Sequence, residues 1–127
     1  MSNMKHKTFG ETLRERRKGR RIQLGTLATM LDVAPSYLSD IELGRRPPLR
    51  ADLIRRCATL LDLDDRGLDE LLEAATVERD TFELPVEHHI PESIELSATL
   101  MREWTQMSPD NKRAVTNFVR ELKQNKK

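Results

Sequence analysis

The sequence predicts an all-α protein, and three observations lead to that fold class. The chain of 127 residues is 4% aromatic and 34% charged, a composition typical of helical rather than β-rich proteins. Apolar residues recur at the three- and four-residue spacing of amphipathic helices. Signals that start and stop helices separate these apolar runs. We expect a five-helix domain over residues 1–75, a linker or extended arm over 76–91 and a helical hairpin over 92–127.

The formal net charge is only +1, but the charges are unevenly distributed. Residues 1–56 hold 13 Lys/Arg and 6 Asp/Glu, a net charge of +7, whereas residues 57–98 hold 2 and 12, a net charge of −10. Residues 99–127 hold 7 and 3, a net charge of +4. A basic block of this kind is typical of a surface that binds nucleic acid. The alternative is a solvated charged face without a ligand.

The sequence shows none of the patterns that a catalytic or cofactor site requires. It has no Gly-rich phosphate loop and no nucleophile beside a base, so we expect no enzyme activity and no cofactor. Adjacent His88 and His89 would point apart, so we expect no metal site. The single cysteine, Cys57, excludes an internal disulfide and fits a reducing compartment. No apolar run approaches the ~18 residues of a membrane span, so we expect a cytoplasmic protein without membrane contact.

The first helix should cover residues 9–19. Thr8 and Glu11 have the spacing of a capping box, in which each side chain accepts a hydrogen bond from the other residue's backbone N–H. Phe9 and Leu13 would face the core, and residues 1–7 would form a loose basic arm. The helix and its end also carry a dense basic cluster: Arg14, Arg16, Arg17, Lys18, Arg20 and Arg21.

Two short helices joined by a tight turn follow. The helix over 24–31 has Gln23 as its expected N-cap and apolar residues at helical spacing on one face. The helix over 35–43 begins at Pro35, because a proline loses no hydrogen bond at the first helical position. It ends at Gly44, as expected of a residue just beyond a helix. A helix, a turn of about four residues and a second helix are the parts of a helix-turn-helix.

This stretch resembles the Cro/repressor type of helix-turn-helix, the xenobiotic-response-element family of bacterial and phage regulators. The resemblance covers roughly residues 8–75. The chain departs from the family pattern at Leu24, where glutamine is frequent, and at Asp32, where glycine is frequent. Asp adopts the left-handed conformation more easily than most residues, so the turn can form with Asp32 in place of glycine. The resemblance is carried by Leu13, Arg17, Leu27, Ala28, Val33, the run from Pro35 to Ser39, Ile41, Glu42 and the run from Gly44 to Arg46.

The resemblance implies which residues meet the bases of double-stranded DNA. In the family, the first turn and the sixth residue of the second helix approach the major groove, which here gives Pro35, Ser36 and Asp40. Ser36 can donate or accept at either base type, and Asp40 can accept from a cytosine amino group. The alternative for Asp40 is a salt bridge to Arg45 or Arg46.

A second set of residues is expected to contact phosphates: Gln23, Tyr37, Ser39, Arg45, Arg46 and Arg50. Gln23 would lie at a helix N-terminus, which favours anions. The alternative for Tyr37 is a half-buried packing role, and the alternative for the arginines is surface charge on a proline-stiffened loop. The resemblance also implies that Arg17 pairs with Glu42 and supports the recognition helix. For Arg17 we expect this structural role first and phosphate contact second.

Two further helices should complete the first domain. The helix over 50–61 places apolar residues on one face, and Cys57 lies in that stripe. A buried structural thiol is therefore expected, rather than a reactive one. The helix over 66–75 adds a further apolar stripe that closes the core.

The rest of the chain has two parts. Residues 76–91 contain two prolines and no helical period, and the alternation at 82–86 allows a short strand or a docked segment. Residues 92–124 form a helical hairpin, whose second helix starts at Ser108-Pro109. A dimer interface is the preferred interpretation; the alternatives are packing on the fourth and fifth helices or binding a partner protein such as a toxin or sensor. The expected interface residues are Met101, Trp104, Val115, Phe118 and Leu122.

These observations favour a sequence-specific DNA-binding transcription regulator. We expect a repressor that acts as a homodimer on an inverted-repeat operator. The alternative is an antitoxin or adaptor-type module, in which the hairpin of residues 92–127 holds a partner protein.

Overall fold

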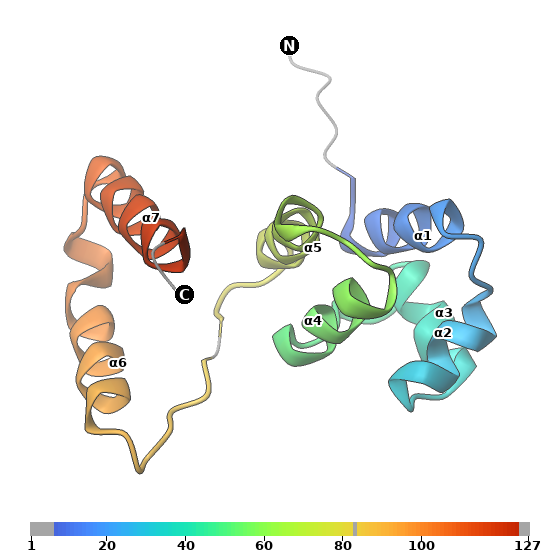
Figure 1. Cartoon of the computed structure of the whole chain (residues 1–127), viewed down its shortest axis with the longest axis horizontal. Helices are drawn as coiled ribbons and strands as arrows, with labels where there is room; N and C mark the ends of the chain where they lie inside the picture. Colours follow the sequence, from blue (N-terminus) through green and yellow to red (C-terminus); the bar gives the residue numbers. More distant parts are fainter. Residues whose placement is uncertain (1–6, 83, 125–127) are drawn as a thin grey trace. The chain divides into compact units, whose positions relative to one another are not determined.

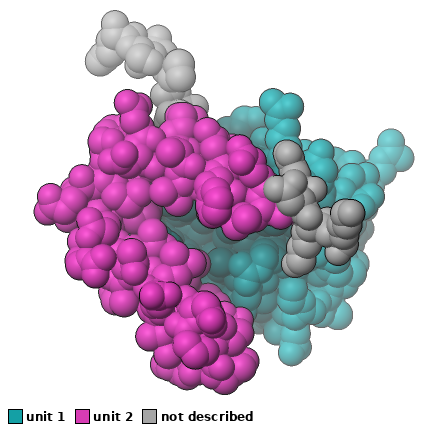
Figure 2. Space-filling view, turned by 60° about the vertical axis from the view of Figure 1, so that its left-hand side comes forward, with its two compact units in different colours: residues 1–82 teal, residues 83–127 magenta. Residues whose placement is uncertain are grey.

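The computed structural model describes residues 7–82 and 84–124, and within these ranges the chain is all-helical and contains no strand (Figure 1). The all-α prediction is confirmed. Residues 1–6 of the expected arm over 1–7, residue 83 of the expected linker and residues 125–127 of the expected hairpin lie outside the described residues. The chain divides into two compact units, Met1–Phe82 and Glu83–Lys127, coloured teal and magenta in Figure 2. Each unit is described by itself below.

The first unit contains α1 (Phe9–Gly19), α2 (Leu24–Leu31), α3 (Pro35–Glu42), α4 (Ala51–Leu60) and α5 (Asp65–Val77). The second unit contains α6 (Pro91–Glu103), the 3₁₀ helix η1 (Trp104–Gln106) and α7 (Pro109–Gln124). None of the helices in the described ranges combines the length and the hydrophobicity that a bilayer span requires.

The helix boundaries of the first unit follow local signals in the sequence. The Thr8 hydroxyl accepts from the Glu11 N–H and the Glu11 carboxylate accepts from the Thr8 N–H, each at 3.0 Å, so the capping box is confirmed. Asp32 ends α2 in the left-handed conformation with φ 61°, which an Asp tolerates. Pro35 opens α3, and Gly44 follows it with φ 79°. Asp32 and Pro35 thus mark the two ends of the turn between α2 and α3.

The core of the first unit takes apolar side chains from every one of its helices. α1 packs on α3 and α5, α2 packs on α3 and α4, and α4 packs on α5. Cys57 of α4 is fully buried, as expected, and burial raises the pKa of its thiol to about 12. The largest fully buried side chains are Phe9, Leu13, Leu27, Leu31, Leu38, Ile41, Leu49, Ile54, Leu61 and Leu71.

Gly10 allows α1 to touch the end of α3 directly. A Cβ at this position would lie 2.5 Å from the Ile41 carbonyl oxygen and 2.7 Å from the Glu42 carbonyl carbon. Both neighbours are backbone atoms, which cannot move aside as a side chain does. The close approach of α1 and α3 therefore requires glycine.

The segment after α5 is tied to the first unit more closely than we expected. α5 continues to Val77, two residues into the segment assigned to a linker. Glu78 then accepts a hydrogen bond from the Phe9 N–H at 2.6 Å, where α1 begins. The Arg79 guanidinium donates to the carbonyls of Pro48 and Leu49, the latter at 2.6 Å. The chain therefore crosses back over the first unit before it leaves it.

In the second unit, Ser108 caps α7, since its hydroxyl accepts from the Asn111 N–H at 3.0 Å. The Asn111 side chain in turn accepts from the Ser108 N–H at 3.2 Å. η1 continues directly from the end of α6, and Figure 1 shows α7 running at an angle to α6. The predicted hairpin is thus present as two successive helices, not as a closely packed pair. The alternation at 82–86 had allowed a short strand, but the described residues of this segment form none.

Candidate nucleic-acid interface

α3 presents one polar face outward because its apolar residues are used in the core. Leu38 and Ile41 are fully buried, whereas Pro35 and Ser36 at the start of the helix are exposed. Asp40, one turn further on, is half-exposed. The three expected base-reading positions therefore lie on the accessible side of one short helix. This is the arrangement that a helix needs to enter a DNA groove.

A buried ion pair holds the end of α3 against α1. Arg17 Nε lies 2.8 Å from Glu42 Oε2, and Arg17 Nη2 lies 2.9 Å from Glu42 Oε1. Arg17 Nη1 also donates to the Ile22 carbonyl at 2.9 Å, which ties in the loop before α2. The hydrogen bond to Glu42 raises the pKa of Arg17, against the opposing effect of burial. The Arg17 side chain is only 9% exposed, which favours its structural role over phosphate contact.

Asp40 lies between two arginines of the following loop. Its Oδ1 is 3.8 Å from Arg45 Nη1 and its Oδ2 is 3.8 Å from Arg46 Nε. The salt bridge that was the alternative interpretation of Asp40 is thus present in the protein without DNA. Both arginine side chains are more than half exposed, so they remain accessible to a phosphate.

Tyr37 supports one of these arginines. It is half-buried and packs against the core, as its alternative interpretation expected. The Arg46 guanidinium lies over the Tyr37 ring, 5.2 Å from its centroid, in the geometry of a cation–π contact. The structure thereby brings together Tyr37, Asp40, Arg45 and Arg46, and we call these four residues the arginine cluster.

The remaining expected phosphate contacts lie outside the arginine cluster. Gln23 is exposed at the N-cap of α2, but its side chain makes no capping hydrogen bond. Arg50 is exposed at the N-cap of α4. Ser39 is half-exposed on α3. None of the contacts described within residues 7–82 joins these three side chains to the arginine cluster.

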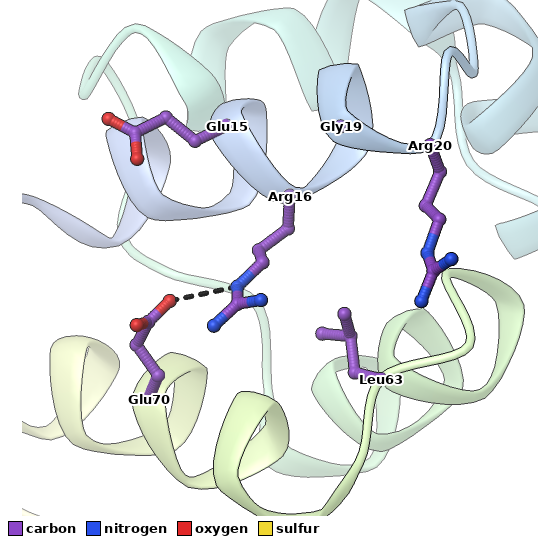
Figure 3. A pocket seen from close by; sticks show the side chains of 6 residues that line it. All are labelled: Glu15, Arg16, Gly19, Arg20, Leu63 and Glu70. Carbon is purple, nitrogen blue, oxygen red and sulfur yellow. Dashed lines mark hydrogen bonds and ion pairs between the residues drawn. The ribbon is translucent and has the colours of Figure 1, made fainter.

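Much of the basic cluster on α1 is engaged by the protein itself. Arg16 Nε lies 3.0 Å from Glu70 Oε1 of α5. Arg20 donates to the carbonyls of Leu61 and Asp62 at 2.7 and 2.8 Å. These two arginines point from α1 toward α5 and the loop before it, and line an open groove of about 410 Å³ (Figure 3). This part of the basic block stabilises the packing of the helices. The residues lining the groove are Glu15, Arg16, Gly19, Arg20, Leu63 and Glu70.

Sequence reasoning missed Arg79 as a residue that supports the site. Its guanidinium holds the carbonyls of Pro48 and Leu49, which end the loop that carries Arg45 and Arg46. One signal was present in the sequence, because Arg66 and Arg79 are the only Lys or Arg residues between positions 57 and 98. A lone arginine in an acidic segment without helical period is consistent with a specific contact.

Within residues 7–82 and 84–124, no three His, Cys, Asp or Glu side chains lie close enough together to hold a metal ion. Two exposed guanidinium groups beside an accessible polar helix can bind phosphates while the helix meets base edges.

Comparison with known families identifies the first unit. Residues 8–80 match the sequence model described as a helix-turn-helix domain. The match covers more than half of the chain, includes all of α1 to α5 and extends to the Glu78 and Arg79 contacts. No curated protein and no solved structure matches the chain.

Proposed function

The chain belongs to the helix-turn-helix domain family of DNA-binding regulators, and we propose that it is a sequence-specific transcription regulator of the Cro/repressor type. It acts as a homodimer on an inverted-repeat operator and represses the promoter that it covers. Two recognition helices, one from each copy, would occupy successive major grooves on one side of the duplex.

The observation that carries the proposal is the pairing of a fixed helix with accessible cations. The buried Arg17–Glu42 pair fixes α3, while Arg45 and Arg46 stay exposed at its end. Rigid positioning of the helix supports sequence reading, because base contacts require a defined register. Exposed arginines supply the phosphate contacts that dominate affinity for DNA.

Binding requires an exchange of partners at Asp40. In the free protein its carboxylate neutralises Arg45 and Arg46 at 3.8 Å each. On DNA the two arginines move to phosphate oxygens, and the carboxylate accepts from a cytosine amino group. Ser36 and Pro35 meet the neighbouring base pair. A site without cytosine at that position leaves Asp40 unpaired beside phosphates, and so is rejected.

Selection of binding sites from a random duplex library tests the proposal. The full chain is used at near-physiological salt. The expected result is an enriched inverted repeat with half-site centres ~10 base pairs apart. No enrichment, with only salt-sensitive retention of any duplex, would show that the basic surface binds the DNA backbone alone.

A transcription assay then tests the direction of regulation. The selected operator is placed across the start region of a promoter and the protein is titrated. Loss of transcript at the concentration that fills the operator supports repression, whereas an increase would make the protein an activator.

A further inference from the structure

The loop between α3 and α4 carries Arg45, Arg46 and Arg50, three of the expected phosphate contacts. All three are exposed, whereas Pro48 and Leu49 within the loop are buried. The two prolines of this loop have no N–H, so they cannot donate the backbone hydrogen bonds that usually hold a loop in place. The geometry of the loop therefore depends on what its carbonyl groups contact.

A single nitrogen of Arg79 holds two of these carbonyls. Arg79 Nη2 donates to the Pro48 oxygen and to the Leu49 oxygen, the latter at 2.6 Å. The peptide group of the Pro48 carbonyl also contains the Leu49 N–H, and the next peptide group contains the Arg50 N–H. Because a peptide group is planar, the two hydrogen bonds constrain the backbone from Pro48 to Arg50.

Arg79 is anchored, because it directly follows the last turn of α5. Its backbone N–H donates to the Thr76 carbonyl at 3.1 Å. The Glu78 N–H donates to the Ala75 carbonyl at 3.2 Å. The Glu78 carboxylate accepts from the Phe9 N–H at 2.6 Å, one of the N–H groups at the start of α1 that have no partner within the helix. We call Glu78 and Arg79 the clasp, since they join the end of α5 to α1 and to the loop after α3.

The loop is thus held at both of its ends. At its start, the buried Arg17–Glu42 pair ties the last residue of α3 to α1. At its other end, the clasp holds two successive carbonyls. Only residues 43–47 lie between the two fixed points, and they carry both arginines of the arginine cluster. A loop that is ordered before binding has less conformational entropy to lose when its side chains meet phosphates.

Arg79 itself is poorly placed to bind a phosphate. It is half-buried, whereas Arg45, Arg46 and Arg50 are exposed. Its Nη2 would first have to release both carbonyls, and the buried Leu49 would lose this hydrogen bond at a cost in stability. An effect of Arg79 on DNA binding would therefore act through the loop.

We propose that Arg79 is a positioning residue for DNA binding, which holds the loop in the shape in which Arg45 and Arg46 meet phosphates. The inference rests on the proposed function and assigns a role in it to a residue outside the expected DNA contacts. Breaking the clasp lets the loop move in the free protein, and DNA must then order it at a cost in affinity. The phosphate contacts in the complex stay the same.

Removal of the guanidinium tests the inference, and the chain offers a matched control. Arg79→Met keeps the apolar part of the side chain and removes every donor. Arg20→Met makes the same charge change at an arginine that also donates to two successive carbonyls, those of Leu61 and Asp62 at 2.7 and 2.8 Å (Figure 3). The loop that Arg20 holds lies between α4 and α5 and carries no expected DNA contact.

The variants are compared under conditions in which urea unfolding shows them to be folded. Arg79→Gln is a second variant that breaks the clasp, because its amide is too short to reach the two carbonyls. It should behave like Arg79→Met in each measurement, and it replaces that variant if the methionine side chain prevents folding.

NMR relaxation of the backbone amides in the full chain without DNA measures the order of the loop. The amides of Leu49 and Arg50 are the reporters, because they share peptide groups with the carbonyls that Arg79 holds. We expect order parameters near the rigid value of ~0.85 in the wild type and in Arg20→Met, and a fall to ~0.6 or below in Arg79→Met. Reporters that stay rigid in Arg79→Met would overturn the inference.

Titration of the selected operator at several salt concentrations measures the consequence for binding. Arg79→Met should raise Kd at least ~5-fold, which corresponds to ordering the backbone of about one residue. The slope of log Kd against log salt should stay that of the wild type, because the same phosphates are contacted. Arg20→Met should change Kd less than ~2-fold at near-physiological salt, where a distant charge is screened.

Two results of this titration would overturn the inference. A slope that is lower by about 0.9 in Arg79→Met would make Arg79 a phosphate contact itself. Equal losses of affinity in Arg79→Met and Arg20→Met would reduce its role to stability or net charge.

The two measurements also separate this inference from the proposed function. A wild-type chain that enriches no operator contradicts the proposed function, and the relaxation comparison still decides whether Arg79 orders the loop. An operator bound with the same Kd by Arg79→Met and by the wild type contradicts only the role of Arg79.

Discussion

Asp40 pairs with both arginines of the loop after α3, and under the proposed function this pairing limits binding to the wrong DNA. Its carboxylate lies 3.8 Å from a guanidinium nitrogen of each of two arginines that face solvent. These contacts lie at the long end of ion pairing and are accessible to water, so they contribute little to stability. We expect them to affect binding instead, because a phosphate that recruits Arg45 or Arg46 must first displace Asp40.

Asp40→Ala should relax the preference at one base pair of each half-site by ~1–3 kcal/mol. The reason is the loss of the acceptor for a cytosine amino group. Binding to non-specific duplex should strengthen, because two cations lose their partner. Repeating the site selection and measuring competition by random duplex checks both effects. Unchanged sequence preference with only tighter non-specific binding would show that Asp40 repels phosphates and reads no base.

Cys57 gives a pH dependence whose sign follows from its environment. Burial raises the pKa of the thiol from 9.0 to about 12 in the folded chain. The unfolded chain therefore loses this proton first, so the contribution of the thiol to stability is complete below pH 9 and is lost as the pH rises toward 12. Between pH 8 and pH 10 the wild type should lose roughly 1 kcal/mol more stability than Cys57→Ala. Urea unfolding of both proteins at the two pH values measures the difference, and parallel losses would contradict it.

At the scale of the helices, the position of α3 depends on a close approach to α1. Gly10 has the Ile41 and Glu42 backbone against it, and the Arg17–Glu42 pair lies two turns further along α1. Together they hold the C-terminal end of α3 against α1. The angle of the recognition helix is thus a property of α1 as much as of the turn after α2.

Gly10→Ala should destabilise the first unit by ~1–3 kcal/mol, because the added methyl group meets backbone that cannot yield. Gly19→Ala is the matched control at the other end of α1, since a Cβ there would have no neighbour within 4 Å. The control should be neutral or stabilising by up to ~1 kcal/mol, as expected when alanine replaces a helical glycine. Urea unfolding compares the two, and equal effects would contradict the close approach.

Local signals predicted the helices, and the long-range contacts could not be predicted. The capping box at Thr8, the left-handed Asp32 and the proline that opens α3 each act within a few residues. Arg79 instead contacts carbonyls 30 and 31 residues earlier in the chain, and Gly10 meets backbone more than 30 residues away. A periodic pattern records which face of a helix is buried, but not which element covers it.

The candidate site likewise contains one contact that local sequence signals could not predict and one group of contacts that is nearly local. The Arg17–Glu42 pair followed from family resemblance, because nothing local connects residues 25 positions apart. The cluster of Tyr37 and Asp40 with two arginines is nearly local, and its parts were proposed as alternatives. Which alternative holds in the free protein depends on rotamers that the sequence does not specify.

At the scale of the whole molecule, the arginines fall into two groups: some hold the helices together and others stay accessible to solvent. Arginines of α1 hold α5 and the loop before it, whereas those after α3 stay accessible. The net positive charge of the first 56 residues thus overstates the surface available to DNA. A few residues should carry most of the phosphate binding.

Arg45→Ala/Arg46→Ala should weaken operator binding about tenfold or more and reduce the salt slope by roughly 2, about 0.9 for each lost phosphate contact. Arg55→Ala/Arg66→Ala removes the same charge from exposed positions of α4 and α5 and should have a much smaller effect. Titration of the selected operator at several salt concentrations measures both. Equal losses in the two variants would show that only net charge matters.

The contacts of Glu78 and Arg79 limit how far the chain can be shortened from its C-terminal side without destabilising the first unit. Truncation at residue 75 would leave the Phe9 N–H and the carbonyls of Pro48 and Leu49 without their partners. The buried Leu49 carbonyl would be costly to leave unpaired. A protease that cleaves in the segment before α6 should therefore release a folded fragment that keeps Arg79. We expect the smallest autonomous DNA-binding fragment to end beyond that arginine, and expression of shorter fragments should yield unstable protein.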